Sequence, residues 1–216
     1  MNVVSIPNGA FLENCYLVID EAARQCVIVD PGEDAGLILG QVAATDARPV
    51  AVWLTHAHLD HVLGVGRVAA ETGAPVFLHP DDRALYDHVP QQAEAFGLRA
   101  AGVPPPPPDR AFAHGDEVRV GMLRFSVRHT PGHSPGSVCL VGQGVVFAGD
   151  VLFQGSIGRT DLPGGDVDAL LGSIERELLV LPDSTIVYSG HGPQTTIGAE
   201  RRGNPFLTGA FRPAGP

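Results

Sequence analysis

The chain has 216 residues, of which 24 are acidic and 14 are basic, so its formal net charge at pH 7 is −10 and its pI is near 5.2. This length is enough for one well-filled core, and we predict one domain over residues 1–216. The acidic balance disfavours a nucleic-acid partner, because affinity for phosphates comes largely from basic side chains that release counterions. No basic-then-apolar leader opens the chain, and no apolar run approaches the roughly 20 residues that cross a bilayer, so we expect a cytoplasmic protein with no membrane partner.

Short apolar runs and turn residues alternate through the first half of the chain. Apolar residues have helical spacing over 37–44, and the continuous apolar run at 50–54 is typical of a strand that is covered on both faces. A second helix-and-strand unit follows, divided by the breaker Thr72-Gly73-Ala74-Pro75. The predicted strands are 16–19, 27–29, 50–54 and 76–78, and the predicted helices are 37–44, 63–71 and 81–88.

The second half returns to strands after a proline-rich segment. Residues 90–109 are small and polar and contain five consecutive prolines, so we predict a surface excursion with polyproline II character. Further strands are predicted at 117–120, 123–129, 137–140, 145–147 and 185–189, and a helix at 167–180. Two sheet-rich halves that each carry helices predict an α+β fold: a four-layer αββα sandwich with two mixed sheets flanked by helices.

The densest group of reactive side chains comes directly after the strand at 50–54. The segment Thr55-His56-Ala57-His58-Leu59-Asp60-His61 places three imidazoles and a carboxylate within six residues, a density that packing does not explain. Three more such residues follow predicted strands: His133, Asp150 and His191. Loops at strand ends gather into one site because the sheet fixes their positions, so we expect these four loops to converge.

The combined pattern resembles the metallo-β-lactamase superfamily from Asn14-Cys15-Tyr16 to Asn204-Pro205-Phe206. By position, the resemblance implies a first metal site of His56, His58 and His133, a second of Asp60, His61 and His191, and Asp150 as the carboxylate that bridges both. The resemblance implies one or two zinc ions. Iron or manganese is also open, because the set contains no thiolate and imidazole suits zinc and iron alike.

Such a site lowers the pKa of a bound water from 15.7 towards roughly 7, which supplies hydroxide at neutral pH. We expect this metal-bound hydroxide to be the nucleophile. Asp60 and Asp150 are the catalytic candidates, since their carboxylates can orient the attacking water while the metal polarises the carbonyl oxygen.

Two further stretches resemble the short glyoxalase II-like subgroup, whose members resemble hydroxyacylglutathione hydrolase. They are the glycine-rich segment 155–166 and Gly190-His191-Gly192-Pro193. The resemblance implies a small-molecule thioester substrate, S-lactoylglutathione or a related hydroxyacyl thioester. Long-form enzymes add a C-terminal helical domain whose basic residues hold the glutathione carboxylates. We expect no such domain here, and therefore broader or weaker thioester recognition.

Arginines are the candidates for holding an anionic substrate group, because all the basic residues are arginine. Arg159 is the first substrate-binding candidate, since glycines surround it with permissive backbone. A salt bridge to Asp161 or Asp166 is an equally weighted alternative. Arg201 and Arg202 are more typical of a solvated charged face.

Other functions use the same residues. An iron persulfide dioxygenase of the same superfamily is the main rival, because His56, His133 and Asp150 also supply a two-histidine, one-carboxylate triad open to oxygen. β-Lactamase and lactonase activities remain open as side activities, since loops set the substrate pocket in this fold. A catalytically silent metal-binding module is the third class, in which the proline run docks an aromatic groove.

Seven residues of potentially reactive types fall outside these assignments. We expect the thiols to pack as small hydrophobes and the remaining histidines to be structural or solvated. They are Cys15, Cys26, Cys139, His79, His88, His114 and His129.

Overall fold

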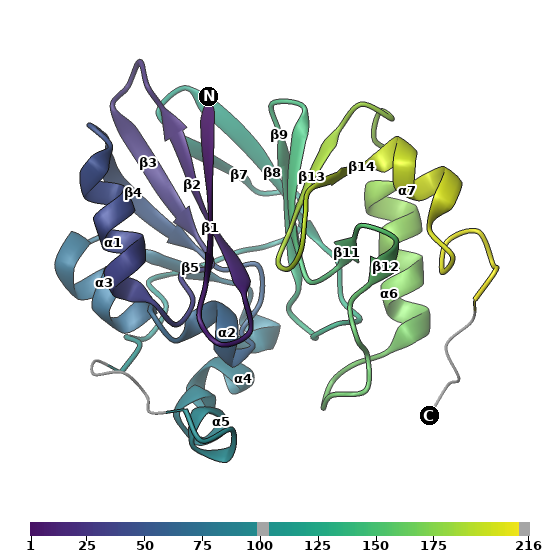
Figure 1. The fold of residues 1–216 in the computed structure, drawn as a ribbon, viewed down its shortest axis with the longest axis horizontal. Helices are drawn as coiled ribbons and strands as arrows, with labels where there is room; N and C mark the ends of the chain where they lie inside the picture. Colours follow the sequence, from purple (N-terminus) through teal and green to yellow (C-terminus); the bar gives the residue numbers. More distant parts are fainter. Residues whose placement is uncertain (99–103, 212–216) are drawn as a thin grey trace.

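The computed structural model describes residues 1–98 and 104–211. Two β-sheets stand face to face, with helices on the outer side of each (Figure 1). In spatial order the first sheet contains β1 (Asn2–Asn8), β2 (Glu13–Asp20), β3 (Gln25–Val29), β4 (Arg48–Trp53), β5 (Val76–Leu78) and β6 (Arg110–Ala111). The second contains β14 (Thr195–Thr196), β13 (Ile186–Ser189), β10 (Val145–Gly149), β9 (Val138–Gly142), β8 (Leu123–His129) and β7 (Glu117–Val120).

Both sheets mix parallel and antiparallel pairs. In the first sheet β1, β2 and β3 are antiparallel, and β3 through β6 are parallel. In the second sheet only the β10–β13 pair is parallel. The outer helices are α1 (Ala35–Ala44) and α3 (Val65–Thr72) on the first sheet, and α6 (Val167–Ser173) and α7 (Ile197–Gly203) on the second. The predicted four-layer αββα sandwich is therefore confirmed.

Three apolar layers hold the four structural layers together. The strand β2 is buried along its whole length, and its side chains alternate between two of these layers: Leu17 packs toward α1 and α3, whereas Val18 packs between the sheets. The third layer joins the second sheet to α6 and α7, through residues such as Val146 and Leu170. The free thiols of the chain are all buried, as expected of small hydrophobic side chains.

Local signals in the sequence explain where several helices begin and end. The carboxylate of Asp34 accepts a hydrogen bond from the backbone of Leu37 and caps α1, and Asp166 caps α6 in the same way. The helix α3 ends at Gly73, whose φ of +66° is the left-handed conformation that glycine adopts at little cost. These caps lie at the ends of helices that the sequence predicted.

The proline-rich prediction was wrong for its first part. The helix α5 (Val89–Ala95) follows α4 (Arg83–Asp87) directly, where we predicted polyproline II character from residue 90. Pro90 lies in the first turn of α5, where its missing N–H costs nothing, and Gln-Gln-Ala-Glu-Ala continues the turn with good helix formers. Residues 99–103 of the predicted excursion lie outside the described residues. Pro104–Pro108 have no regular secondary structure.

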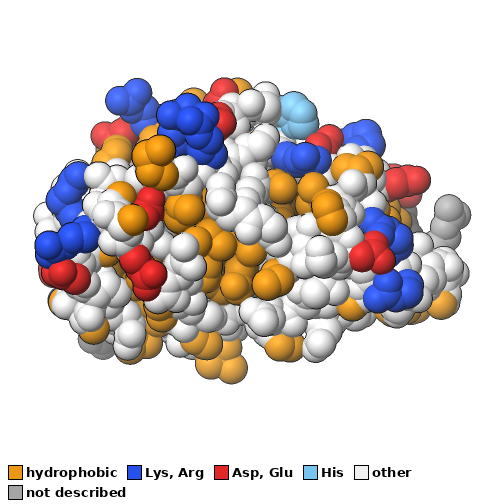
Figure 2. All heavy atoms as spheres, turned by 90° about the horizontal axis from the view of Figure 1, so that it is seen from above, with side chains coloured by type: hydrophobic (Ala, Val, Ile, Leu, Met, Phe, Trp, Pro, Cys, Tyr) orange, Lys and Arg blue, Asp and Glu red, His pale blue; other side chains and the backbone are white. Residues whose placement is uncertain are grey.

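The two ends of the sandwich differ. The end seen from above carries hydrophobic side chains over its middle, with arginine and acidic side chains on either side (Figure 2). The opposite end carries the short helix α2 (Leu59–Val62) together with α4 and α5 (Figure 1). No helix in the described part of the chain has the length and apolar character needed to span a membrane.

We predict that Phe147→Ala lowers the free energy of unfolding by about 3–5 kcal/mol. Phe147 is fully buried between the sheets and contacts Tyr16, Phe125 and Tyr188 at ring-centroid distances of 5.5, 6.0 and 5.2 Å. Urea unfolding followed by circular dichroism measures the change. Met122→Ala is the control, because Met122 is 78% exposed and its truncation should change stability by less than about 0.5 kcal/mol. A loss below about 1 kcal/mol for Phe147→Ala would contradict tight packing between the sheets.

Candidate metal centre

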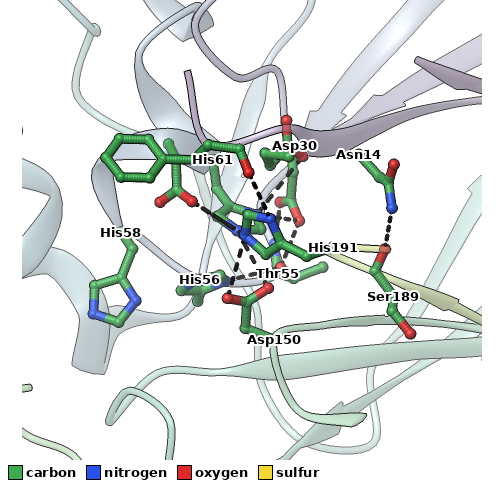
Figure 3. A network of polar contacts seen from close by, with 12 residues as sticks. Asn14, Asp30, Thr55, His56, His58, His61, Asp150, Ser189 and His191 are labelled. Carbon is green, nitrogen blue, oxygen red and sulfur yellow. Dashed lines mark hydrogen bonds and ion pairs between the residues drawn. The ribbon is translucent and has the colours of Figure 1, made fainter. Parts of the chain in front are cut away.

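Four loops from the two sheets meet at the end of the sandwich near α2. His56 and His58 follow β4, and Asp60 and His61 begin the helix α2. The second sheet contributes the other three residues from the carboxyl ends of β8, β10 and β13: His133, Asp150 and His191. In Figure 3 the labelled side chains of His56, His61, Asp150 and His191 point toward one another, and His58 lies to one side of them. The predicted convergence of the motif loops is present.

Three imidazoles form a close buried group. Nε2 of His133 lies 2.8 Å from Nδ1 of His58 and 3.2 Å from Nε2 of His56. The three residues are at most 8% exposed. Tetrahedral coordination with bonds of about 2.0–2.1 Å separates ligand nitrogens by about 3.3 Å, which is close to these distances. The group can therefore hold one metal ion.

A second group, formed by Asp60, His61 and His191, lies beside the three histidines. Nε2 of His191 lies 3.2 Å from Oδ2 of Asp60, and Nε2 of His61 lies 3.8 Å from that oxygen. Asp150 stands between the two groups. Its Oδ1 lies 3.4 Å from His61 Nε2, and its Oδ2 lies 3.6 Å from Nε2 of both His133 and His191. The geometry thus brings together all seven residues that the sequence singled out as metal ligands.

Hydrogen bonds fix which imidazole nitrogen faces the centre. Nδ1 of His133 donates to the backbone carbonyl of Arg159 at 2.8 Å, and Nδ1 of His191 lies 3.2 Å from the carbonyl of Phe11. Nδ1 of His61 lies 3.1 Å from Asp30 Oδ2. An imidazole that donates through Nδ1 keeps its Nε2 lone pair free, which is the usual arrangement around a histidine ligand. These three rings therefore present Nε2 to the centre.

Two atoms of the centre are buried without a hydrogen-bond partner among the described residues: Nε2 of His61 and Oδ1 of Asp150. Burying polar atoms in this way costs free energy unless a ligand compensates. They lie 3.4 Å apart and belong to a set of imidazoles and carboxylates with no thiolate. Such a donor set fits a divalent zinc, iron or manganese ion.

The electrostatics of the two groups differ. Burial lowers the pKa of His58 to about 4, and the ring of His133 adds to this effect. Burial also disfavours charge on His61, yet the carboxylates of Asp150 and Asp60 raise the pKa of His61 well above its usual value. Despite burial, the pKa of the Asp150 carboxyl falls, mainly because of His61. His58 is thus a neutral donor at neutral pH, whereas His61 favours positive charge beside the ionised carboxylates of Asp60 and Asp150.

The loop that carries His191 is tied to the first sheet. The backbone N–H of Asn14 donates to the carbonyl of Gly190 at 2.7 Å, and its side-chain amide donates to the carbonyl of Ser189 at 3.1 Å. The hydroxyl of Tyr16 also donates to that carbonyl, at 2.6 Å. These contacts account for two residues of the Asn14-Cys15-Tyr16 motif. A side chain at Gly190 would collide with Asp150 and His61, so only glycine fits there.

Two buried aspartates that support the candidate ligands, Asp30 and Asp82, were not predicted from the sequence. Asp30 accepts hydrogen bonds from the backbone and hydroxyl of Thr55 at 2.7 and 2.6 Å and contacts His61. Asp82 is fully buried and accepts from the backbone of Ala57 at 2.9 Å. A carboxylate in the turn that closes a strand, such as Asp30-Pro31-Gly32, is a sequence signal for the first. Asp82 lies in a polar run that gave no such signal.

Asp82 joins the two loops that hold the three-histidine group. Its Oδ2 accepts from the hydroxyl of Ser134 at 2.8 Å as well as from Ala57, and its Oδ1 accepts from the backbone of Gly136 at 2.6 Å. Ala57 stands between His56 and His58, and Ser134 follows His133. One buried carboxylate therefore sets the separation of these loops.

The three candidate arginines, Arg159, Arg201 and Arg202, each pair with a carboxylate of the protein. Arg159 lines the cleft above the centre, but its guanidinium donates two hydrogen bonds of 2.7 Å to Asp161. Arg202 pairs with Asp183, and Arg201 pairs with the same carboxylate and donates to the backbone carbonyls of Leu179 and Leu181. The salt bridge of Arg159 is therefore with Asp161.

A further pair of histidines lies beside the centre. The rings of His79 and His129 stack at a centroid distance of 4.0 Å, close to the carboxylate of Asp81. Nε2 of His129 lies 2.8 Å from the carbonyl of Pro135 and so donates to it, and Nδ1 of His79 accepts from the backbone of Asp81. Nε2 of His129 and Nδ1 of His79 thus each have a hydrogen-bond partner in the protein, which agrees with the structural role expected of these rings.

Comparison with known proteins gives the same picture. The family model described as Metallo-beta-lactamase superfamily matches residues 8–191. The chain belongs to the metallo-β-lactamase superfamily. It is 39% identical over 211 residues to the hydroxyacylglutathione hydrolase GloC of Haemophilus influenzae, covering 96% of this chain and 98% of that protein.

Two solved structures support the fold and the metal centre. The BLEG-1 B3 metallo-beta-lactamase has a TM-score of 0.87 at 42% identity, over 96% of this chain and 100% of that one. The protein TTHA1623, solved in a di-iron-bound form, has a TM-score of 0.82 at 44% identity, over 94% of this chain and 100% of that one. Members of this superfamily at similar identity thus include a β-lactamase and a protein that holds two iron ions. The predicted resemblance to the glyoxalase II-like subgroup is confirmed by the similarity to GloC. The di-iron-bound relative and the clustered histidines and aspartates support a divalent metal ion.

We predict that Asp82→Ala weakens binding of zinc to the three-histidine group by roughly 10–100-fold, as is typical for loss of a supporting hydrogen-bond partner. The variant leaves the backbone donors of Ala57 and Gly136 unpaired, so the free energy of unfolding should also fall by about 1–3 kcal/mol. Competition with a chromophoric chelator measures the affinity. Asp87→Ala is the matched control, because Asp87 is exposed and pairs with Arg83 on α4. An unchanged zinc affinity in Asp82→Ala would refute this positioning role.

Proposed function

We propose that the protein is a metal-dependent hydrolase of thioesters, with S-lactoylglutathione or a related hydroxyacylglutathione as its substrate. The observation that carries this proposal is a cluster of five imidazoles and two carboxylates beside a cleft of about 990 Å³. Three of the imidazoles and both carboxylates line the floor of that cleft: His58, His133, His191, Asp60 and Asp150. The similarity to the hydroxyacylglutathione hydrolase GloC supports the choice of thioester. A cleft of this size is suited to a small molecule.

The proposed ligands form two sets that share one carboxylate. His56, His58 and His133 would hold a first ion and Asp60, His61 and His191 a second, with the carboxylate of Asp150 beside both groups. A bound zinc, iron or manganese ion supplies a Lewis acid for the thioester carbonyl and lowers the pKa of a coordinated water.

The side chains of the protein orient the reactants. The carboxylates of Asp60 and Asp150 accept hydrogen bonds from the attacking water and direct its lone pair toward the carbonyl carbon. Because the pKa of both carboxyls is lowered despite burial, they are ionised acceptors at neutral pH. A thiol has a pKa of about 8.5, so the thiolate leaves without a dedicated acid from the protein.

A persulfide dioxygenase uses part of the same set, and one experiment separates the two functions. We expect purified protein to contain zinc or mixed metal and to release thiol from S-lactoylglutathione at the same rate with and without oxygen. Metal analysis and a thiol-release assay under air and under nitrogen measure this. One iron per chain, no thioester turnover and oxygen uptake on glutathione persulfide would instead assign His56, His133 and Asp150 to oxygen chemistry.

We predict that His58→Ala and Asp150→Ala each lower kcat/KM for thioester hydrolysis by roughly 100-fold or more, because each removes a metal ligand. Both variants should keep the circular dichroism spectrum of the wild type, since neither residue fills the apolar layers. His114→Ala is the control, because His114 is exposed and lies outside the cleft. Unchanged turnover in both variants would remove the basis for a metal-dependent mechanism.

A further inference from the structure

The walls of the cleft are mostly apolar. The floor contains His58, His133 and His191 with Asp60 and Asp150. The walls come from distant parts of the chain: the β1–β2 turn, α2, α4, α5 and the loop after β12 (Ser156–Ile157). Apolar side chains of these walls are Phe11, Leu59, Leu85, Phe96, Ile157 and Leu162.

Two phenylalanines meet at one wall although both are exposed. The rings of Phe11 and Phe96 contact edge to face at a centroid distance of 5.8 Å, and the residues are 40% and 60% exposed. Neither belongs to the apolar layers formed by the described residues. Apolar side chains gathered beside a reactive centre are typical of a ligand-binding surface. Folding alone does not require these two rings at the surface.

The charged residues of the walls also favour an apolar group over an anionic one. Among the described residues that line the cleft, Arg159 is the single arginine, and its Nε and Nη2 both donate to the carboxylate of Asp161. Asp81 adds a further carboxylate to the wall. A carboxylate on the substrate therefore gains little from these walls, whereas an aliphatic chain gains from leaving water.

We propose that the cleft binds its thioester through an apolar acyl chain, so that aliphatic acyl thioesters of medium length are better substrates than acetyl thioesters. This inference rests on the proposed thioester hydrolysis. The reaction needs no oxidant: the water oxygen forms a bond to the acyl carbon, and the carbon–sulfur bond breaks. Its electron pair leaves with sulfur, and the products are the carboxylic acid and the free thiol.

The first test varies only the acyl chain on a carrier without carboxylates. Acetyl, butanoyl, hexanoyl and octanoyl thioesters of N-acetylcysteamine are compared with the metal-loaded enzyme. Burial of each methylene should raise kcat/KM about two- to fourfold until the cleft is filled. A flat or falling series in an enzyme that hydrolyses S-lactoylglutathione would overturn the inference and leave the proposed function standing.

Variants locate the effect in the cleft. Leu85→Ala and Phe96→Ala should lower the ratio of octanoyl to acetyl kcat/KM by about fivefold or more, because each removes apolar wall. Met122→Ala is the matched control, since Met122 is a large exposed apolar residue outside the cleft. Its ratio should equal that of the wild type. Equal ratios in all four proteins would overturn the assignment of the acyl chain to this wall.

A binding measurement separates the two proposals if no thioester is hydrolysed. Absence of turnover in metal-loaded enzyme contradicts the proposed function. Calorimetric titration with S-ethyl, S-butyl and S-octyl thioethers of N-acetylcysteamine then tests the apolar wall alone. A Kd that falls with chain length in the wild type, but less in Phe96→Ala, supports the apolar site. A Kd independent of chain length overturns it.

Discussion

The apolar layer between the two sheets sets the distance between the loops that carry the reactive side chains. One sheet supplies the loop with His56 and His58, and the other supplies His133 and His191. Neither loop set is complete, so the centre exists only where the sheets are held face to face. The contact of Phe147 with Tyr16 of β2 and that of Phe125 with Trp53 of β4 cross between the sheets and provide that constraint. Burial of aromatic surface contributes a large but nondirectional stabilisation. Hydrogen bonds then fix how the loops of the two sheets are positioned relative to one another.

Those hydrogen bonds come mainly from buried carboxylates and carbonyls around the centre. Asp82 ties the first histidine loop to the second sheet, and Asp30 holds Thr55 and His61 on the first. Asn14 ties the His191 loop back across the sheets. A buried carboxylate is costly unless donors surround it, so each of these residues ties stability to the shape of the centre. The cluster of imidazoles and carboxylates favours a bound cation for the same reason.

Above the centre the cleft combines a charged floor with apolar walls. The floor residues are the proposed ligands of the metal, and they set the chemistry that the site performs. The walls are formed by α4, α5 and the β1–β2 turn, and they are the surface proposed to hold the acyl chain of the substrate. This division explains how one superfamily can include a β-lactamase and a hydroxyacylglutathione hydrolase at similar identity to this chain. The loops above a common floor are the part that determines the substrate.

The sequence by itself determined the sandwich, most of its strands and the seven candidate ligands. Apolar periodicity is a local property, and the spacing in His56-Ala57-His58-Leu59-Asp60-His61 is visible without a fold. The strand β1 and the helices α5 and α7 were missed, because their local patterns are weak. The strand β1 is mostly exposed or half-buried, α5 carries a proline in its first turn, and α7 contains two glycines. Only the tertiary structure decided that Asp82 joins two histidine loops and that Arg159 is bonded to Asp161. It also brought Phe11 and Phe96 together beside the centre, since contacts between residues so far apart in the chain follow from packing and not from spacing.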